Sequence, residues 1–102
     1  MRLLIVGSLG GQIGAASLIA ISRGAKVMQM DSIKGALELL RSGEGADLLM
    51  IDVQEDVRSL VDSLQSERIN VPVVACGIGN DTVSAVRAIK AGAKEYIPLP
   101  PS

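Results

Sequence analysis

The chain has no histidine, tryptophan or phenylalanine, and it has one tyrosine and one cysteine among its 102 residues. Without an imidazole it has no histidine for acid–base catalysis, for a metal site or for a Ser-His-Asp triad. A single cysteine makes neither an intrachain disulfide nor a zinc site, and such cysteine usage is typical of the reducing cytoplasm. One aromatic ring leaves almost nothing on which nucleic-acid bases can stack.

Excess charge and long apolar runs are also missing. The formal net charge is −1, so the chain has no electrostatic attraction for nucleic acid or for an anionic membrane. The apolar run near the N-terminus, residues 3–6, is too short for a signal peptide or a membrane span. What remains is a globular composition, 48% hydrophobic and 21% charged, whose length supports one domain over residues 1–102.

Five short apolar segments alternate with segments of helical periodicity. We predict strands at residues 3–6, 27–30, 48–51, 71–76 and 95–97, and helices at about 13–21, 32–41, 57–64 and 82–91. Asp56, and Asp or Asn at 80–81, are suited to cap the last two helices. Repeated strand–helix–strand units predict a parallel sheet with helices on both faces.

The pattern also makes local predictions. In the last helix, Val83, Val86 and Ile89 are expected to face inward. Pro98, Pro100 and Pro101 are expected to end the regular structure. No fifth helix follows, so we expect either a fragment of a longer protein or a partner that covers the apolar face left open.

Two segments carry a family resemblance. Residues 46–52, ADLLMID, resemble the third strand of response-regulator receiver domains, which ends in the phosphoaccepting aspartate, here Asp52. Residues 86–97, VRAIKAGAKEYI, are similar to the receivers' fourth helix and fifth strand, with Tyr96 at the aromatic switch position. The resemblance implies an α/β, flavodoxin-like (CheY-like) fold, a doubly wound parallel five-stranded sheet of order 2-1-3-4-5, here without the final helix.

The opening MRLLIVG, with Gly11-Gln12 after it, resembles the N-terminal domain of FlbD-type flagellar transcription activators, which are NtrC-like. In that family a receiver-like domain precedes an ATPase that acts on sigma-54 polymerase and a helix-turn-helix domain. The resemblance implies a regulatory domain of a two-component-type transcription regulator, which is not itself an enzyme.

The chain departs from the receiver pattern around Asp52. Gly7 and Ser8 stand where receivers have two acidic residues that hold Mg²⁺. Gly77 replaces the hydroxyl residue that contacts the phosphoryl group, and Leu99 replaces the lysine that pairs with it. Because phosphoryl transfer requires neutralised charge, we expect weak or absent Mg²⁺ binding, no cofactor and no usual phosphorylation switch.

Three other interpretations remain open. Asp52 is either an exposed strand-end carboxylate that accepts backbone N–H bonds or the working phosphoacceptor of a conventional receiver. The glycine-rich turn at 7–14 resembles a nucleotide-binding turn, with Ser8 at the first glycine position. Gly77 and Gly79 either cradle an anion or only shape a loop.

Regulation by protein contacts requires a surface. We expect self-association as a dimer or binding of a regulatory protein through the last helix and last strand, at Ala85, Ala88, Ile89 and Tyr96. Arg87, Lys90 and Lys94 follow one helix face and either meet an acidic partner or are solvated. Cys76 is expected to be a buried, unreactive strand residue.

Overall fold

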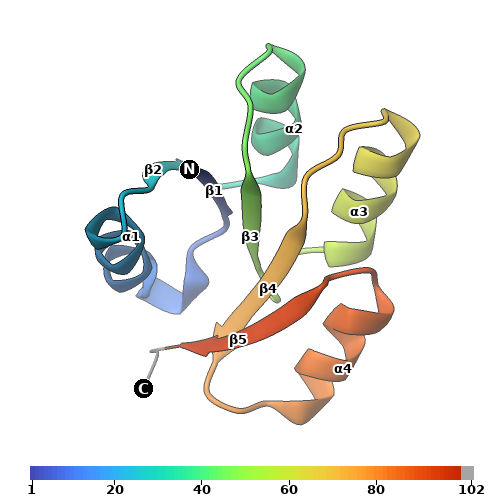
Figure 1. Ribbon diagram of the computed structural model, residues 1–102. Coiled ribbons are helices and arrows are strands. Elements are labelled where there is room, and N and C mark those ends of the chain that lie inside the picture. Colours follow the sequence, from blue (N-terminus) through green and yellow to red (C-terminus); the bar gives the residue numbers. More distant parts are fainter. Residues whose placement is uncertain (100–102) are drawn as a thin grey trace.

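A computed structural model describes residues 1–99, with the backbone alone at positions 10 and 19. Five parallel strands form one sheet of order β2-β1-β3-β4-β5, which is the predicted order (Figure 1). The strands are β1 (Arg2–Val6), β2 (Lys26–Met30), β3 (Leu48–Asp52), β4 (Val73–Ile78) and β5 (Glu95–Leu99). The helices are the 3-10 turn η1 (Leu9–Gly11) and the α-helices α1 (Ile13–Ser22), α2 (Ile33–Arg41), α3 (Val57–Ser66) and α4 (Thr82–Lys90).

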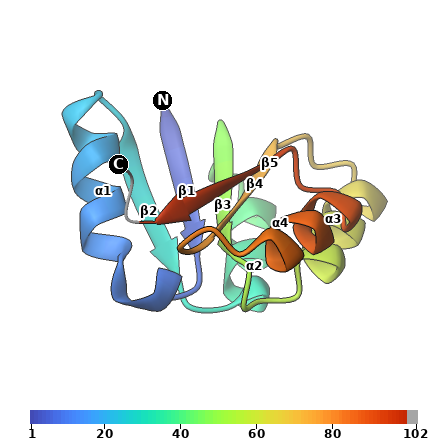
Figure 2. The same ribbon diagram turned by 90° about the horizontal axis from the view of Figure 1, so that it is seen from below.

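The sheet separates two apolar cores, because successive strand residues point to opposite faces. Helices α2, α3 and α4 cover one face, on which Leu4, Leu49 and Ala75 are buried. Helix α1 covers the other face, with Ile5 and Cys76 beneath it. Figures 1 and 2 show α1 on one side of the strands and the other three α-helices on the opposite side. One face is therefore covered by three helices and the other by one.

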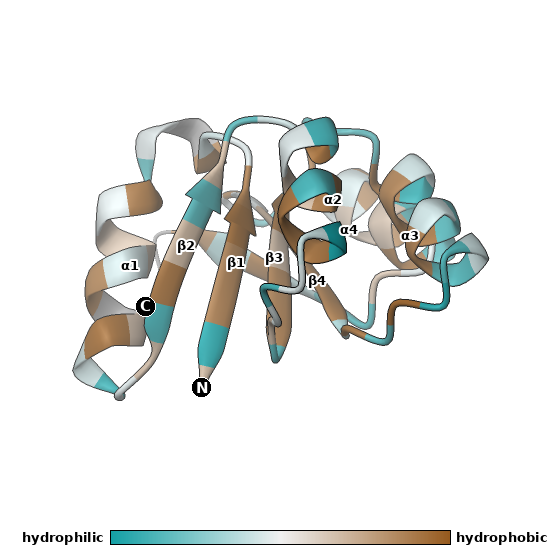
Figure 3. Cartoon of the chain, turned by 90° about the horizontal axis from the view of Figure 1, so that it is seen from above, coloured by the Kyte–Doolittle hydropathy of each residue, from teal (hydrophilic) through white to brown (hydrophobic). Residues whose placement is uncertain are grey.

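The helix starts follow the capping residues. Ser32, Asp56 and Asp81 each accept a hydrogen bond from the amide three residues on, at 3.0–3.2 Å. Helix α1 has no side-chain cap, and it is apolar on its outer side too, since Leu18 and Ile21 are exposed (Figure 3). No helix within residues 1–99 is long and apolar enough to cross a bilayer.

The fourth and fifth strands differ from the prediction. β4 begins after Pro72 and includes Gly77, which we had expected in a loop, and β5 continues through Pro98; Pro100 and Pro101 lie outside the described residues. The two strands pair along almost their whole length, from Val74 opposite Glu95 to Ile78 opposite Leu99. Proline is tolerated because β5 is an edge strand, so the missing amide hydrogen interrupts no ladder on its outer side.

Helix α4 is turned differently from the prediction. Val83, Val86 and Ile89, predicted to face inward, are 66%, 47% and 47% exposed. Ala88 is buried and Ala85 is half-buried, so small side chains form the stripe that faces the sheet. The helical periodicity correctly identified a stripe of large apolar residues, but it assigned that stripe to the wrong side of the helix. The alanines lie against the sheet, and the larger side chains are exposed to solvent. Ala88 is therefore not part of an accessible partner surface.

Candidate functional site

Asp52 ends β3 at the carboxyl edge of the sheet, where the loops after β1 and β3 meet. It is 4% exposed, so the expectation of an exposed carboxylate is wrong. Its Oδ1 accepts a hydrogen bond from the Gln54 amide at 2.9 Å, which is the backbone contact predicted for a strand-end carboxylate. In the sheet register its partner on β4 is Cys76. Asp52 is thus a buried acid held by its own loop.

Gly7 fits closely against this acid. Its φ is +99°, and a Cβ added there would lie 2.7 Å from the Asp52 Cβ and 3.3 Å from the Glu55 Cγ. Any larger residue at this position would have to displace Asp52 and adopt a strained backbone. Glu55, which the sequence reasoning missed, therefore lies beside Asp52. Its only signal in the sequence is that it lies three residues after Asp52.

The glycine-rich segment 7–14 folds down onto the sheet. Leu9 opens η1 with a φ of +52°, unusual for leucine, and is only 1% exposed. It packs into the core on the α1 side, together with Ile5 and Leu99. Ser8 just before it is exposed, and α1 begins only at Ile13. A buried leucine thus occupies the middle of the turn that resembles a nucleotide-binding loop.

Gly77 makes room for Tyr96. A Cβ at Gly77 would collide with the Tyr96 hydroxyl and would lie 2.9 Å from the Val53 Cγ2. The Tyr96 hydroxyl donates a hydrogen bond to the carbonyl of Gly79 at 3.2 Å. Burial, with the charge of Asp81, raises the pKa of the Tyr96 phenol above its ordinary value. Because the ring hydroxyl fills the space over Gly77, this strand glycine is not part of an open anion cradle.

A cavity of about 270 Å³ lies between Asp52 and Tyr96. Within residues 1–99 its lining contains two carboxylates, Asp52 and Asp81, and no basic side chain. Leu99, at the position of the receivers' lysine, is 4% exposed and packs into the core beneath α1. No group of three potential metal-ligating side chains occurs in the described part of the chain. The cavity beside Asp52 is therefore lined by acidic, neutral polar and apolar side chains, and by no basic one among the described residues.

Cys76 is buried, as expected from its place in a strand. Burial, and secondarily the charge of Asp52, raises the pKa of its thiol to about 12. A thiol with such a pKa is not a nucleophile at neutral pH. Although Cys76 pairs with Asp52 in the sheet, its thiol therefore adds no reactive group to the site.

Comparison with known proteins shows what the chain is similar to. No family model matches the chain. It is 52% identical over 101 residues to the transcriptional regulatory protein FlbD of Caulobacter vibrioides, a match that covers 99% of the chain and 22% of FlbD. NtrX from Brucella abortus has a TM-score of 0.83 at 22% identity, covering 99% of this chain and 23% of NtrX. The receiver domain of Francisella response regulator 1452 has a TM-score of 0.77 at 21% identity, covering 99% and 85%. The chain therefore has the fold of response-regulator receiver domains, and in sequence it is similar to the fifth or so of FlbD that the match covers.

Proposed function

We propose that this receiver domain regulates through protein–protein contacts, without the usual Mg²⁺-dependent phosphorylation of Asp52. The observation that carries the proposal is the environment of Asp52, which contains Glu55 and Asp81 but no cation in the described residues. A phosphoryl group on Asp52 would add negative charge beside both acids. Receivers offset that charge with a metal ion and a lysine, and Leu99 at the lysine position faces the core instead.

The proposed target of this regulation is a downstream region of a longer transcription regulator. The chain corresponds to 22% of FlbD, so a FlbD-like protein has room for further domains. The resemblance to NtrC-like activators makes those domains a sigma-54-dependent ATPase and a helix-turn-helix DNA-binding domain. The receiver would act on them in the cytoplasm, and it would not itself contact DNA.

A self-association surface on α4 and β5 is part of the proposal. On these two elements Ile89 is 47% exposed, and Ala85 and Tyr96 are half-buried. Ile89→Asp should convert a dimer of the chain into a monomer in sedimentation experiments, because a charge would replace an apolar contact. If the oligomeric state stays the same, the dimer surface lies elsewhere.

The decisive experiment is a ¹H–¹⁵N NMR titration with Mg²⁺ and then with beryllofluoride, which mimics an acyl phosphate. We expect the amides of Ser8, Asp52 and Gly77 to stay still at millimolar Mg²⁺, and beryllofluoride to cause no change at Tyr96. The matched control is Asp52→Asn, which removes the acceptor and so identifies shifts unrelated to it. Shifts in the native chain that Asp52→Asn abolishes would make this a conventional phosphorylatable receiver and overturn the proposal.

A further inference from the structure

A groove of about 730 Å³ lies between α3 and α4 and adjoins the Asp52 cavity, with which it shares Val53, Gln54 and Ser84. Its apolar lining includes Val53, Val57, Val83, Val86 and Ala91, with the buried Ala88 beneath them. Val83 and Val86 are 66% and 47% exposed, so two large apolar side chains of α4 face water along this groove. Figure 1 shows α3 and α4 side by side. Exposed apolar side chains gathered along a concave surface mark a site of interaction.

Three cations border the same groove. Arg58 from α3 donates a hydrogen bond to the Lys90 carbonyl at 2.9 Å, and Arg87 and Lys90 lie in the last turn of α4. Within residues 1–99 none of the three forms an ion pair; the pairs there join Arg2 to Glu44 and Arg41 to Glu67. The last-turn position lets Arg87 and Lys90 offset the helix dipole, but it does not account for Arg58 or for the valines.

Two carboxylates also line the groove, and they leave the balance positive. Asp56 is engaged as the cap of α3, where it accepts a hydrogen bond from the Ser59 amide at 3.0 Å. Glu55 lies beside Gly7 and Asp52. The groove thus combines an apolar floor with cations that form no ion pair among the described residues, although Arg87 lies near enough to Asp81 to lower the pKa of that carboxyl group.

We propose that this groove docks an amphipathic helix of a partner protein that carries carboxylates along the edge of its apolar stripe. Apolar side chains at positions i, i+3 or i+4, and i+7 of such a helix would enter the groove and pack against its valines. Its carboxylates then face Arg58, Arg87 and Lys90, with charge-assisted hydrogen bonds to the two guanidinium groups. This inference deepens the proposed function, since it rests on regulation by protein contacts and specifies the chemistry of one partner.

The test uses the 102-residue chain and two synthetic helical peptides. One peptide has leucines at the spacing above, flanked by glutamates; the other has lysine at each glutamate. In a ¹H–¹⁵N NMR titration at about 0.15 M salt we expect shifts in residues 53–58 and 83–91, and at least tenfold tighter binding of the glutamate peptide. Equal affinity for both peptides, or shifts confined to α1, would overturn the proposal.

Two variants of exposed apolar residues provide a matched control. Val86 on α4 and Ile21 on α1 are 47% and 56% exposed, but only Val86 lines the groove. Val86→Asp should weaken binding of the glutamate peptide at least tenfold, whereas Ile21→Asp should leave it unchanged. The double variant Arg87→Glu with Lys90→Glu should reverse the preference toward the lysine peptide. Equal effects of the two aspartate variants, or no reversal, would overturn the groove as the docking site.

Other occupants give different results. If the groove joins two copies of the chain, Val86→Asp will dissociate a dimer that neither peptide disturbs, and the partner-helix proposal is then wrong. The phosphorylation question is separable, because a chain that binds the glutamate peptide here and also responds to beryllofluoride would refute only the proposed function at Asp52.

Discussion

The contact between Gly77 and Tyr96 gives a quantitative prediction. In Gly77→Ala the new methyl group would collide with the Tyr96 hydroxyl and would come within 2.9 Å of Val53. Overpacking of this kind costs about 1–3 kcal/mol, while replacing a strand glycine by alanine returns about 0.5–1 kcal/mol. We therefore expect a net loss of about 1–2 kcal/mol in the free energy of unfolding. For a domain of this size that corresponds to a fall in Tm of about 5–15 °C.

The second half of this prediction is local. The methyl group should push the Tyr96 ring outward and break its hydrogen bond to the Gly79 carbonyl. Since burial is the main cause that raises the Tyr96 pKa, the outward ring should titrate closer to the ordinary value of 10.0. Tyr96 is the only aromatic residue, so absorbance near 295 nm and tyrosine fluorescence report on this ring alone.

The assay is a double-mutant cycle. The native chain, Gly77→Ala, Tyr96→Ala and the double variant are unfolded in urea and followed by circular dichroism. In the Tyr96→Ala background the alanine at position 77 should cost less than in the native background, with a coupling of about 1 kcal/mol. Additive effects, or a Gly77→Ala chain with unchanged stability and an unchanged tyrosine titration, would refute the placement of the ring over Gly77.

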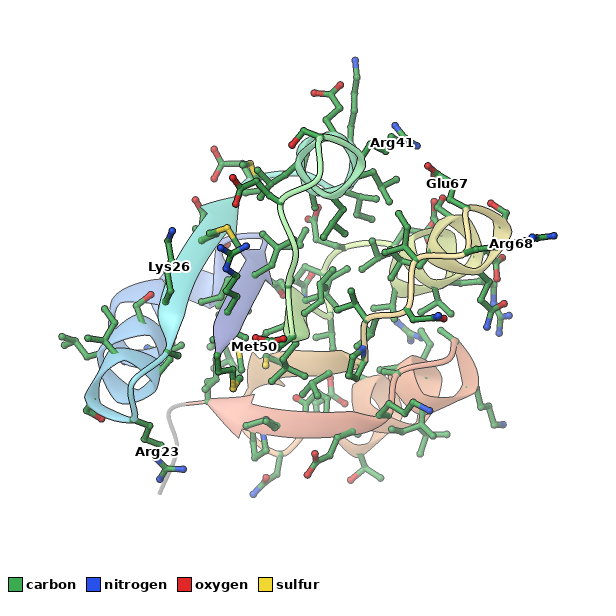
Figure 4. The ribbon with its side chains drawn as sticks, turned by 45° about the horizontal axis from the view of Figure 1, so that its top comes forward. Arg23, Lys26, Arg41, Met50, Glu67 and Arg68 are labelled. Carbon is green, nitrogen blue, oxygen red and sulfur yellow. The ribbon has the colours of Figure 1, made fainter. Side chains whose placement is uncertain are left out.

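Three further predictions follow from buried or paired groups. Leu99→Lys should lower the free energy of unfolding by about 3 kcal/mol, because it puts an ammonium group among core side chains. The new lysine should create no NMR response to beryllofluoride. A stable variant that gains this response would contradict the core position of Leu99. The folded pKa of Cys76, about 12, lies above its ordinary 9.0, so this thiol favours the folded state fully below pH 9 and loses that contribution as the pH rises toward 12. Urea unfolding at each pH should therefore show a steeper alkaline decline for the native chain than for Cys76→Ala, and equal curves would show that the thiol is not buried. Arg41 and Glu67 form a two-bond ion pair at 2.6 and 2.7 Å between the ends of α2 and α3 (Figure 4), and this pair lowers the Glu67 pKa. Glu67→Gln should therefore lower Tm slightly at neutral pH and low salt, and the difference in Tm should disappear both in 1 M salt and at a pH below the Glu67 pKa. A difference in Tm that persists in high salt would point to packing and not to charge.

Much of the fold could be predicted because its signals are local. Short apolar runs on β1 and β3 and the caps before α3 and α4 depend on neighbouring residues, so the strands and helices followed from the sequence, and the sheet order was implied by the family resemblance. The boundaries of β4 and β5 could not be located in this way. Pro98 signals the end of a strand to a local rule, yet it lies in β5 because that strand is at the edge of the sheet.

The candidate site was predictable only in part. The place of Asp52 at the end of a strand is a matter of chain order, and it was predicted. Its burial was not, because it depends on a close approach of Gly7 from a loop 45 residues earlier, and on Glu55 beside both. The outward direction of Val83 and Val86 depends likewise on how closely the small residues of α4 approach the sheet.

The sequence by itself determined a parallel α/β domain with one acid at the tip of its third strand and with glycine or leucine at the positions of the receivers' helper residues. These properties are fixed by residue type and chain order. Only the tertiary structure decided that Asp52 is buried beside Glu55, that Tyr96 lies over Gly77, and that apolar and basic residues of α3 and α4 form one groove. Each of these is a distance between side chains on different elements, and the packing of helices on a sheet sets such distances.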